Sequence, residues 1–475
     1  MDGNKMDRLG FLKGVGALAA MSFVSPTLAH ADSTTVGEKL KNLPSLPPLE
    51  TDVIVVGAGP SGIPAAIAAA RKGARVILLE EDQMAGGAPV DMYVALVCGG
   101  PRVGIYREMI QRLNLNWRSS GSPVEDFGKD GLNGRSTWFL PSSYAIMVHE
   151  MIAEERNITL MCGAHVQHVI LKESGIRNKL EGVSIYRNGH RQDIKASVTI
   201  DATGTGLIGE LSGAPSMYGR DGRSMFNEPF GEEFPDAANV QYLTWQFLTQ
   251  SLRPADLSHR NKLRWKGMVE DNYGWIKAHD QERMAGLFLH WGGNFYCKDT
   301  RDPVELAKTQ AEALESLRPD FSVYQQAGYM VHLAPKIGVR EVRRIKGEYV
   351  ITIKDLLEGK QPDGTVAICN YGFDLKNEKL TEEQRKSARP YGIPYGALVP
   401  LNVEGLLIAG KSISTSHMAQ GSYRVQPIVA SIGQAAGTAA AMAALNKTST
   451  RSIELSKLIA TLDRDGLFEG NKIKK

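Results

Sequence analysis

Three glycines at fixed spacing, Gly57, Gly59 and Gly62 in VIVVGAGPSGIPAAIAAARKGARVILLEE, form an arrangement suited to binding a dinucleotide pyrophosphate. Gly57 suits a tight turn, Gly59 lets the backbone approach the phosphates, and Gly62 lets the following helix pack closely. Glu80, about twenty residues past the turn, can accept the hydroxyl protons of an adenosine ribose and disfavours a 2′-phosphate. The segment therefore predicts a site for an adenine dinucleotide other than NADP.

The elements around these glycines are those that must hold them in place. Residues 53–56 are a run of β-branched side chains, typical of a parallel strand that is buried on both faces. A slim alanine-rich helix follows the turn and directs the positive end of its dipole at the phosphates. A second strand at residues 75–79 leads into Glu80. This order predicts a βαβ unit, which a chance glycine motif would lack.

A second glycine motif, GTGLIG at residues 204–209, has the same spacing in different surroundings. A strand is predicted just before it, but Pro215, Gly219 and a polar stretch stand where a second strand with a terminal acid is needed. The alternative of an NAD site at this motif is therefore disfavoured.

The composition excludes several other classes of protein. The 475 residues suffice for two or three domains, and 55 basic against 52 acidic side chains give no indication of a nucleic-acid partner. The cysteines at positions 98, 162, 297 and 369 form no CxxC or CxxCH pattern. No iron–sulfur, zinc or c-type haem site, and no other metal site, is predicted.

The first 31 residues have the pattern of an export signal. Basic Lys5, Arg8 and Lys13 precede or enter a small apolar stretch, and Ala29-His30-Ala31 is a cleavage-like A-x-A sequence. The stretch around Arg8 resembles the twin-arginine motif, with Leu9 in place of its second arginine. We therefore expect a periplasmic or otherwise exported protein without a membrane span in the mature chain; an uncleaved N-terminal anchor is the alternative.

Changes in composition divide the remaining chain. Residues 32–50 are polar and proline-containing and read as a linker. Residues 51–216 are the first part of the nucleotide-binding domain, and residues 336–446 return to it. Between them, residues 217–335 hold most of the tryptophans and are predicted to form an inserted mixed α+β substrate domain. Residues 447–475 are expected to be a polar, peripheral C-terminal tail.

Several segments together resemble one family. They are the GAGPSG unit, TIDATGTG at 199–206, IGVREVRRIKGEYVIT at 337–352, IPYGALVP at 393–400 and LLIAGKSISTSHMAQGSYRVQPIVASIGQAAGTAAAMA at 406–443. The chain is similar in these to the FAD-dependent oxidoreductases that have a glutathione-reductase-like FAD-binding domain. The resemblance implies a Rossmann-like α/β fold and bound FAD. The heterodisulfide-reductase-A-like relatives also bind iron–sulfur clusters, but this chain lacks the closely spaced cysteines.

The resemblance also implies which residues hold FAD. The turn and its acid would bind the ADP half, a glycine pair would lie by the pyrophosphate or flavin, the ATG turn would close over the adenosine, and two later segments would meet the ribityl chain and ring. The ADP half would be bound by Gly57, Gly59, Pro60, Ser61, Gly62 and Glu80, and the glycine pair is Gly86 and Gly87. The ATG turn consists of Ala202, Thr203 and Gly204. The two later segments are Ala409 with Gly410, and a helix start at Gly433, Gln434 and Ala435. Relatives often carry an acid where this chain has Thr205.

Two side chains are candidates for the catalytic work. His417 and Arg424 lie between the Ala409-Gly410 turn and the helix expected to face the flavin. A neutral imidazole can accept a hydroxyl proton, and a guanidinium can hold a carboxylate or stabilise an oxyanion. The alternatives are a hydrogen-bonded structural histidine, and an arginine in a buried salt bridge or on the pyrophosphate.

Further candidates have stronger structural interpretations. Arg340, Arg343 and Arg344 are predicted to lie on one strand, where solvation or pairing is favoured over a substrate-anion role for Arg340. His290 and Trp291 fit a substrate pocket, but core packing is the more common role of such side chains.

The sequence thus predicts an exported FAD-dependent dehydrogenase or reductase that moves hydride between a small organic substrate, such as a hydroxy compound or sugar derivative, and the flavin. Without a second dinucleotide site, the electron partner is expected to be a cytochrome, a quinone or oxygen rather than NAD(P)H. Two alternatives stay open: an oxidase that uses oxygen at the same site, and a non-catalytic flavin-binding protein that only transfers electrons.

Overall fold

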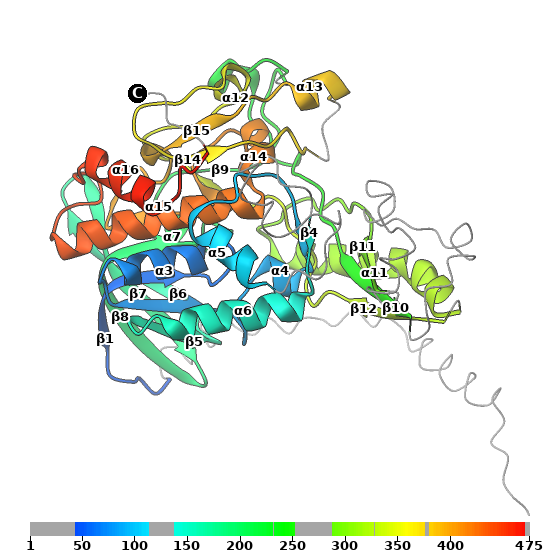
Figure 1. Ribbon diagram of the computed structural model, residues 1–475, viewed down its shortest axis with the longest axis horizontal. Coiled ribbons are helices and arrows are strands. Elements are labelled where there is room, and N and C mark those ends of the chain that lie inside the picture. The colour runs from blue at the N-terminus through cyan, green and yellow to red at the C-terminus, as the bar shows by residue number, and fades with distance from the viewer. Residues whose placement is uncertain are drawn as a thin grey trace, which may run out of the picture.

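The fold is built on a parallel sheet at the centre of the molecule (Figure 1). The computed structural model describes residues 43–113, 137–230, 232–251, 287–326, 328–375 and 380–470. Parallel strands lie side by side in the order β5, β2, β1, β8 and β17. Their bounds are Ile158–Cys162, Val76–Glu80, Leu49–Val56, His190–Asp201 and Leu406–Ile408. The predicted Rossmann-like α/β fold is confirmed, and its glutathione-reductase subtype stays a prediction.

Strand β8 joins two parts of this sheet. Its first half pairs antiparallel with β7 (Arg177–Arg187), which in turn pairs with β6 (His165–Ser174). Its last residues pair with β1 and with β17, so that Val56, Asp201 and Ile408 lie in adjacent strands. The carboxyl ends of the parallel strands therefore meet at one edge, the edge at which such sheets bind nucleotides.

Helix α3 (Gly62–Arg71) follows β1 and packs directly against α15 (Gln426–Leu445) (Figure 1). Two glycines of α15 make this contact close. A Cβ on Gly433 would lie 2.0 Å from the Ser61 carbonyl oxygen, and a Cβ on Gly437 would lie 2.0 Å from that of Ala65. The backbones of the two helices therefore touch where only glycine leaves room.

Helix α15 begins seven residues earlier than Gly433, so the predicted helix start at Gly433–Gln434–Ala435 is wrong. Pro427, in the first turn, is the residue that marks the true start, because proline fits where the helix has no N–H partner to lose. By length and hydropathy α15 could cross a membrane, which the sequence interpretation missed. However, 89% of its apolar window is buried inside the fold, as in the core helix of a soluble protein.

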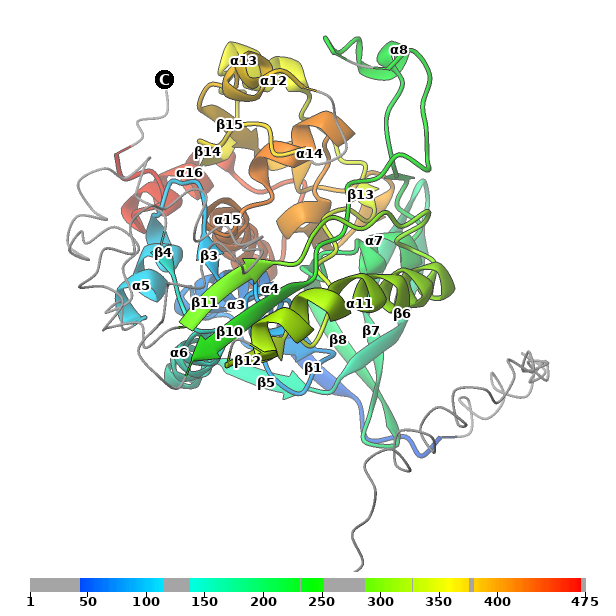
Figure 2. The ribbon, with the colours of Figure 1, turned by 90° about the vertical axis from the view of Figure 1, so that its right-hand side faces the viewer.

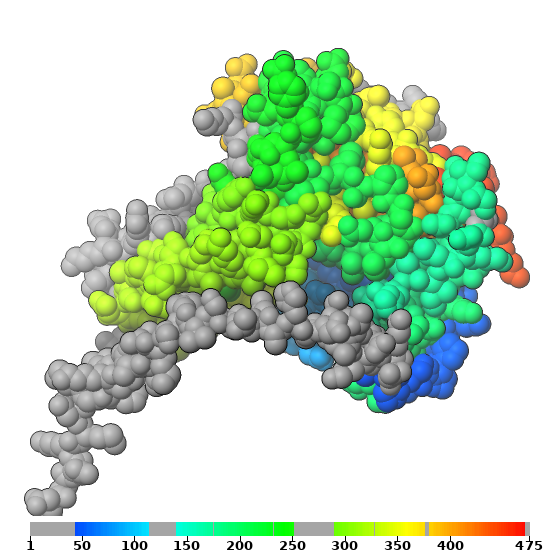
Figure 3. All heavy atoms as spheres, turned by 180° about the vertical axis from the view of Figure 1, so that it is seen from behind, coloured from blue at the N-terminus to red at the C-terminus, as the bar shows by residue number. Residues whose placement is uncertain are grey.

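The insert forms a small antiparallel sheet of its own. Strands β10 (Gln246–Ser251), β11 (Leu287–Trp291) and β12 (Tyr329–Leu333) pair in the order β11–β10–β12. Helix α11 (Pro303–Gln326) packs along β12 and covers this sheet from outside (Figure 2). From behind, α11 forms a ridge beside the segment that precedes β10 (Figure 3). The mixed α+β character predicted for the insert is present in these described elements.

The ends of the described chain are more structured than predicted. Ser45 forms a bridge with Arg191 and β1 begins at Leu49, so the linker predicted for residues 32–50 ends earlier. The C-terminal tail contains α16 (Leu455–Arg464), which buries Leu458 and Leu462 against the fold, so its description as peripheral is wrong there. The predicted export signal at residues 1–31 lies outside the described residues.

Shorter elements complete the structure. Two of them are helices of several turns, α5 (Gly104–Arg112) and α6 (Pro141–Glu154). The others are α4 (Ala88–Asp91), α7 (Leu207–Leu211), α8 (Arg223–Phe226), α12 (Ile353–Glu358), α13 (Glu382–Lys386), α14 (His417–Tyr423), β3 (Leu96–Val97), β4 (Thr137–Trp138), β9 (Ser216–Met217), β13 (Arg344–Ile345), β14 (Thr365–Cys369), β15 (Tyr391–Pro394) and β16 (Val403–Glu404).

Candidate functional site

The glycine turn after β1 is too tight for side chains. Gly57 has a φ of +99°, and a Cβ there would lie 2.6 Å from the Ala202 carbonyl oxygen. A Cβ on Gly62 would lie 1.7 Å from the Gly57 carbonyl oxygen. Gly59 faces Gly87, with 3.8 Å between an added Cβ and the Gly87 Cα. The N-terminus of α3 thus opens onto a surface made of backbone, as a pyrophosphate needs.

The side chain of Ser61 indicates whether a phosphate fits this surface. Its hydroxyl is buried and makes no hydrogen bond among the described residues. Gly410, at a φ of +78°, approaches from the turn after β17: a Cβ added there would lie 3.6 Å from the Ser61 Oγ. Pro60 and the Gly86–Gly87 turn lie beside the same gap, and the Gly86 N–H donates to the Ala58 carbonyl at 2.8 Å. An orphaned hydroxyl at a helix N-terminus fits a phosphate oxygen of FAD.

Glu80 ends β2 beside this turn and is only 5% exposed. Its Oε2 accepts the Ala58 N–H at 2.7 Å, and its Oε1 accepts the Asp82 N–H at 3.0 Å. Burial raises the pKa of this carboxyl, although the two backbone hydrogen bonds oppose the rise. The carboxylate is therefore held at the edge of the turn, where the remaining lone pairs of its two oxygens can accept hydrogen bonds from ribose hydroxyls.

Replacing Glu80 with alanine is expected to weaken FAD binding at least about tenfold, because hydrogen bonds to a charged group contribute about 1.5–3 kcal/mol. FMN lacks the adenosine ribose, so its affinity should change little. Titration of flavin-free protein, followed by flavin fluorescence, measures both affinities. Glu81→Ala, at the exposed neighbouring position, is the matched control; equal losses for FAD and FMN in Glu80→Ala would contradict a ribose contact.

The N–H groups of the second glycine motif are bound by a side chain of the strand that precedes the motif. The buried Asp201, at the end of β8, accepts the N–H groups of Ile208 and Gly209 at 2.9 and 3.0 Å and the Thr203 hydroxyl at 2.6 Å. It thereby caps α7, which is only five residues long. The next strand, β9, pairs antiparallel with β13. The expected lack of a second βαβ unit at this motif is confirmed, while the FAD contacts of Ala202, Thr203 and Gly204 remain predictions.

The residues predicted at the start of α15 have other partners. Gly433 packs on Ser61 of α3, and the Gln434 Oε1 accepts the Ile105 N–H of α5 at 2.8 Å. Ala435 is fully buried within the helix. The true N-terminus lies at Gln426, whose side-chain amide donates to the Val94 carbonyl at 2.6 Å. The helix dipole of α15 therefore begins at Gln426, and the flavin contacts of Gly433, Gln434 and Ala435 remain predictions.

His417 begins α14 inside a buried network of charges. Its Nδ1 lies 2.9 Å from the Glu341 Oε1, and its backbone N–H donates to Asp221 at 2.7 Å. Arg344 binds the same Glu341 and also lies 3.1 Å from the Asp221 Oδ1. His417, Glu341 and Arg344 are all completely buried. This arrangement favours the structural alternative for His417, and its catalytic role stays an untested prediction.

Arg424, at the C-terminal end of α14, lies in a different environment. Its Nη2 donates to the Gln241 Oε1 at 2.9 Å and to the backbone carbonyl of Asp374, and the Asp374 carboxylate is 3.3 Å away. The side chain keeps 10% of its surface exposed. Arg340 lies near it, with its guanidinium carbon 5.6 Å from the Trp291 ring centre and its Nη1 donating to the Tyr242 carbonyl.

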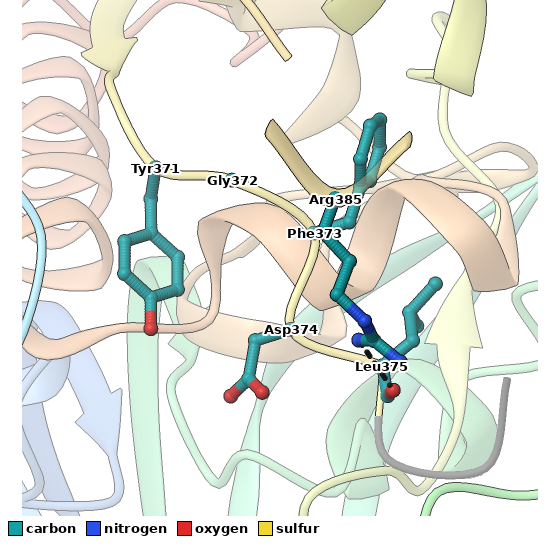
Figure 4. A pocket seen from close by; sticks show the side chains of 6 residues that line it. All are labelled: Tyr371, Gly372, Phe373, Asp374, Leu375 and Arg385. Atoms are coloured by element: carbon teal, nitrogen blue, oxygen red, sulfur yellow. Dashed lines mark hydrogen bonds between the residues drawn. The ribbon is translucent and has the colours of Figure 1, made fainter. Parts of the chain in front are cut away.

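A cavity of about 490 Å³ adjoins Arg424. It is lined by the loop of residues 371–375 and by Arg385 (Figure 4). The Tyr371 ring and the Asp374 carboxylate turn to the same side of this loop, whereas Arg385 reaches back to the Leu375 carbonyl at 3.1 Å. Asp374 both lines the cavity and contacts Arg424, and thereby connects the cavity with the arginine. A volume of this size suits a small organic molecule.

Sequence reasoning missed three members of this site. Gln241 and Asp374 carry no motif, because their importance comes only from contact with Arg424. Lys411 stands in the matched segment LLIAGKS, directly after the predicted Gly410 contact, and its ammonium group donates to the Val339 carbonyl. Among the described residues, no cluster of His, Cys, Asp and Glu has the form of a metal site.

The remaining candidates are structural. The strand β13 covers only Arg344–Ile345, so the prediction of one strand carrying all three arginines is wrong. Arg343 pairs with Glu210 at 2.6 Å. His290 is buried in the insert, stacked on Phe247 and bonded to the Thr249 hydroxyl at 2.7 Å, and burial lowers its pKa to about 3. Core packing is thus its role in the described structure.

Comparison with known proteins gives short or distant matches. A 40-residue segment is 60% identical to the alpha chain of sarcosine oxidase from Corynebacterium sp., covering 8% of this chain and only 4% of that one. A 207-residue segment is 26% identical to thiamine thiazole synthase of Methanococcus vannielii, covering 39% of this chain and 74% of that protein. A geranylgeranyl bacteriochlorophyll reductase-like protein from Thermoplasma acidophilum is 12% identical over 89% of this chain and 85% of its own, with a TM-score of 0.39.

One family covers most of the chain. Residues 52–462 match the family described as FAD dependent oxidoreductase, from within β1 to within the C-terminal α16. The matched range includes the glycine turn, the α3–α15 contact and the site around Arg424. The chain therefore belongs to the FAD-dependent oxidoreductase family, and it is a flavoenzyme with FAD as its cofactor.

Proposed function

We propose that this enzyme is a dehydrogenase or reductase that moves hydride between a small organic substrate and FAD in the cavity beside Arg424. The proposal rests on Asp374, which lines this cavity of about 490 Å³ and also contacts Arg424. When bound, FAD accepts or supplies the hydride, and the substrate loses or gains one C–H bond together with its electron pair. Arg424 would orient the substrate, since its guanidinium is held from two sides.

The location of the enzyme and its electron partner belong to the same proposal. The basic, apolar and A-x-A pattern of residues 1–31 supports export, and the lack of a second βαβ unit at residues 204–209 supports a partner other than NAD(P)H. We propose that a cytochrome or a quinone exchanges electrons with the flavin outside the cytoplasm. Analysis of the N-terminus of the secreted protein would identify the cleavage site, which we expect after Ala31.

The test is anaerobic reduction of the flavin. Denatured enzyme should release about one FAD per chain, and a substrate from a panel of hydroxy compounds, sugars and organic acids should bleach the visible spectrum of the native enzyme. Arg424→Gln is expected to retain FAD and to slow bleaching at least about tenfold, because one hydrogen bond to a charged group is worth about 1.5–3 kcal/mol. Arg343→Gln, in the separate pair with Glu210, is the matched control and should react normally.

The outcomes separate the alternatives. Reoxidation by oxygen with stoichiometric peroxide, and no reaction with cytochrome or quinone, would make the enzyme an oxidase. Normal bleaching by Arg424→Gln would show that the substrate binds elsewhere. A flavin that no compound in the panel reduces, but that exchanges electrons rapidly with a redox protein, would favour the non-catalytic electron-transfer role.

A further inference from the structure

Three cationic side chains lie close together near the insert: Arg340, Lys411 and Arg424. They come from the loop after β12, the turn after β17 and the end of α14. Their charges act on one another. Burial, followed by the charges of Arg424 and Arg340, lowers the pKa of Lys411 to about 8, and burial together with Arg424 lowers the pKa of Arg340. The contacts show the same proximity. Arg340 and Arg424 bind the adjacent residues Tyr242 and Gln241, and Lys411 binds the carbonyl of Val339, the residue before Arg340.

Acidic partners are too few to balance these cations. Arg424 is paired with Asp374 at 3.3 Å. Within the described chain, the polar contacts of Arg340 and Lys411 are to backbone carbonyls, those of Tyr242 and Val339, and neither cation has a carboxylate within 4.0 Å. Two deep positive charges without a counter-ion are costly, and an anion that enters from solution relieves that cost.

The two arginines also retain donors that make no hydrogen bond among the described residues. Each of the three residues keeps a small exposed surface, which for the Arg424 side chain is 10%. The hydrogen bonds of Arg424 within the described structure all use Nη2, and that of Arg340 uses Nη1. Each guanidinium therefore retains a nitrogen for a ligand. A planar guanidinium with spare donors matches the two oxygens of a carboxylate.

The position of the two arginines favours the substrate over the cofactor as that ligand. The phosphate-binding features, Ser61 and Gly410, lie at the N-terminus of α3. Arg340 and Arg424 are instead tied to the insert, through Tyr242, Trp291 and Gln241. Arg424 also shares Asp374 with the cavity. The two guanidinium groups thus lie on the side of the insert, whereas Lys411 directly follows Gly410.

We infer that the substrate carries a carboxylate, which Arg340 and Arg424 bind directly while Lys411 adds positive charge beside them. Gln241 is a positioning residue, because its Oε1 holds Arg424 at 2.9 Å and its backbone N–H is fixed by the buried Glu341 at 3.1 Å. This inference rests on the proposed function, because it assumes that the substrate binds in the same cavity. It narrows the substrate from any small organic molecule to a small organic acid.

The test measures binding separately from turnover. Malonate is titrated into the FAD-loaded enzyme by isothermal titration calorimetry, with malonamide as the uncharged control of similar shape. Wild-type enzyme should bind malonate and show no heat with malonamide. Arg340→Gln and Arg424→Gln should each weaken malonate binding at least about tenfold while retaining FAD. Arg343→Gln, from the same basic run but paired with Glu210, should bind malonate as wild type does.

The pH dependence gives a second measurement. Malonate affinity should fall as the pH rises through about 8, because Lys411, which faces Arg340, Arg424 and Glu341, then loses its proton. Lys411→Met should remove most of this fall. An affinity that stays constant from pH 7 to about 9.5 in the wild type would show that Lys411 does not contribute to the anion site.

Each result bears on one proposal. Equal malonate affinity in all four proteins, or loss of FAD from both Arg340→Gln and Arg424→Gln, would overturn the carboxylate site. An uncharged compound that bleaches the flavin while malonate neither binds nor inhibits would overturn it too, and would leave the proposed function standing. Malonate binding as expected, without any compound that reduces the flavin, would support the anion site and count against the proposed function.

Discussion

Replacing Glu341 with glutamine is expected to lower the free energy of unfolding by about 3–5 kcal/mol, the cost of breaking a buried ion pair from one side. Glu341 is fully buried, binds Arg344, and lies 2.9 Å from the His417 Nδ1. Glutamine keeps the shape of the side chain and removes the charge, so the loss reports electrostatics rather than a cavity. Urea unfolding followed by circular dichroism measures it.

A control and a pH series sharpen this test. Glu382→Gln, in the exposed pair with Lys386, should change stability little. Burial opposes ionisation of Glu341, but His417 and Arg344 hold the pKa of its carboxyl below the usual value. The stabilisation is therefore complete above the unfolded-state pKa of about 4.3 and is lost as the pH falls through the lower folded-state pKa. Equal stability of the wild type and Glu341→Gln at neutral pH would contradict the buried network.

Replacing Gly437 with alanine should also be strongly destabilising, by about 3 kcal/mol, although alanine is the better helix former by about 1 kcal/mol. The added Cβ would lie 2.0 Å from the carbonyl oxygen and 2.8 Å from the Cα of Ala65 in α3. Backbone atoms cannot rotate aside, so α15 must move away from α3. The midpoint of urea unfolding and the FAD content of the purified protein measure the effect.

Gly470→Ala is the matched control for this helix contact. An added Cβ at Gly470 meets nothing within 4 Å, so only its φ of +77° resists the change, at a cost of about 1–2 kcal/mol. A stabilised Gly437→Ala protein would follow helix propensity alone and would show that α3 and α15 do not touch at this position.

Local patterns account for the correct part of the sequence interpretation. The βαβ unit is continuous in sequence, so the β-branched run, the glycines and Glu80 together specify it. Helices α5 and α6 likewise follow from apolar spacing within single segments. The predicted helix start at Gly433 is wrong because this glycine lies inside α15, where it contacts α3, and Pro427 marks the first turn.

The contacts that the sequence could not predict join residues that lie far apart in the chain. His417 meets Glu341 across 76 residues and Asp221 across 196 residues, and no periodicity links such positions. The same holds for Arg424 and Gln241, which are 183 residues apart. A basic run such as that at residues 340–344 shows charge but not partners. Only the fold reveals that Arg343 and Arg344 are paired with acids, whereas Arg340 has no such partner in the described part of the chain.

Strand β17 and helix α15 bring the end of the described chain back to its beginning. β17 completes the parallel sheet beside β8, and α15 packs against α3, the helix that follows the glycine turn. During synthesis, the glycine turn leaves the ribosome long before either partner exists. A nascent chain that stops short of residue 445 cannot close the nucleotide site, so we expect cofactor uptake to be a late step in the maturation of this enzyme.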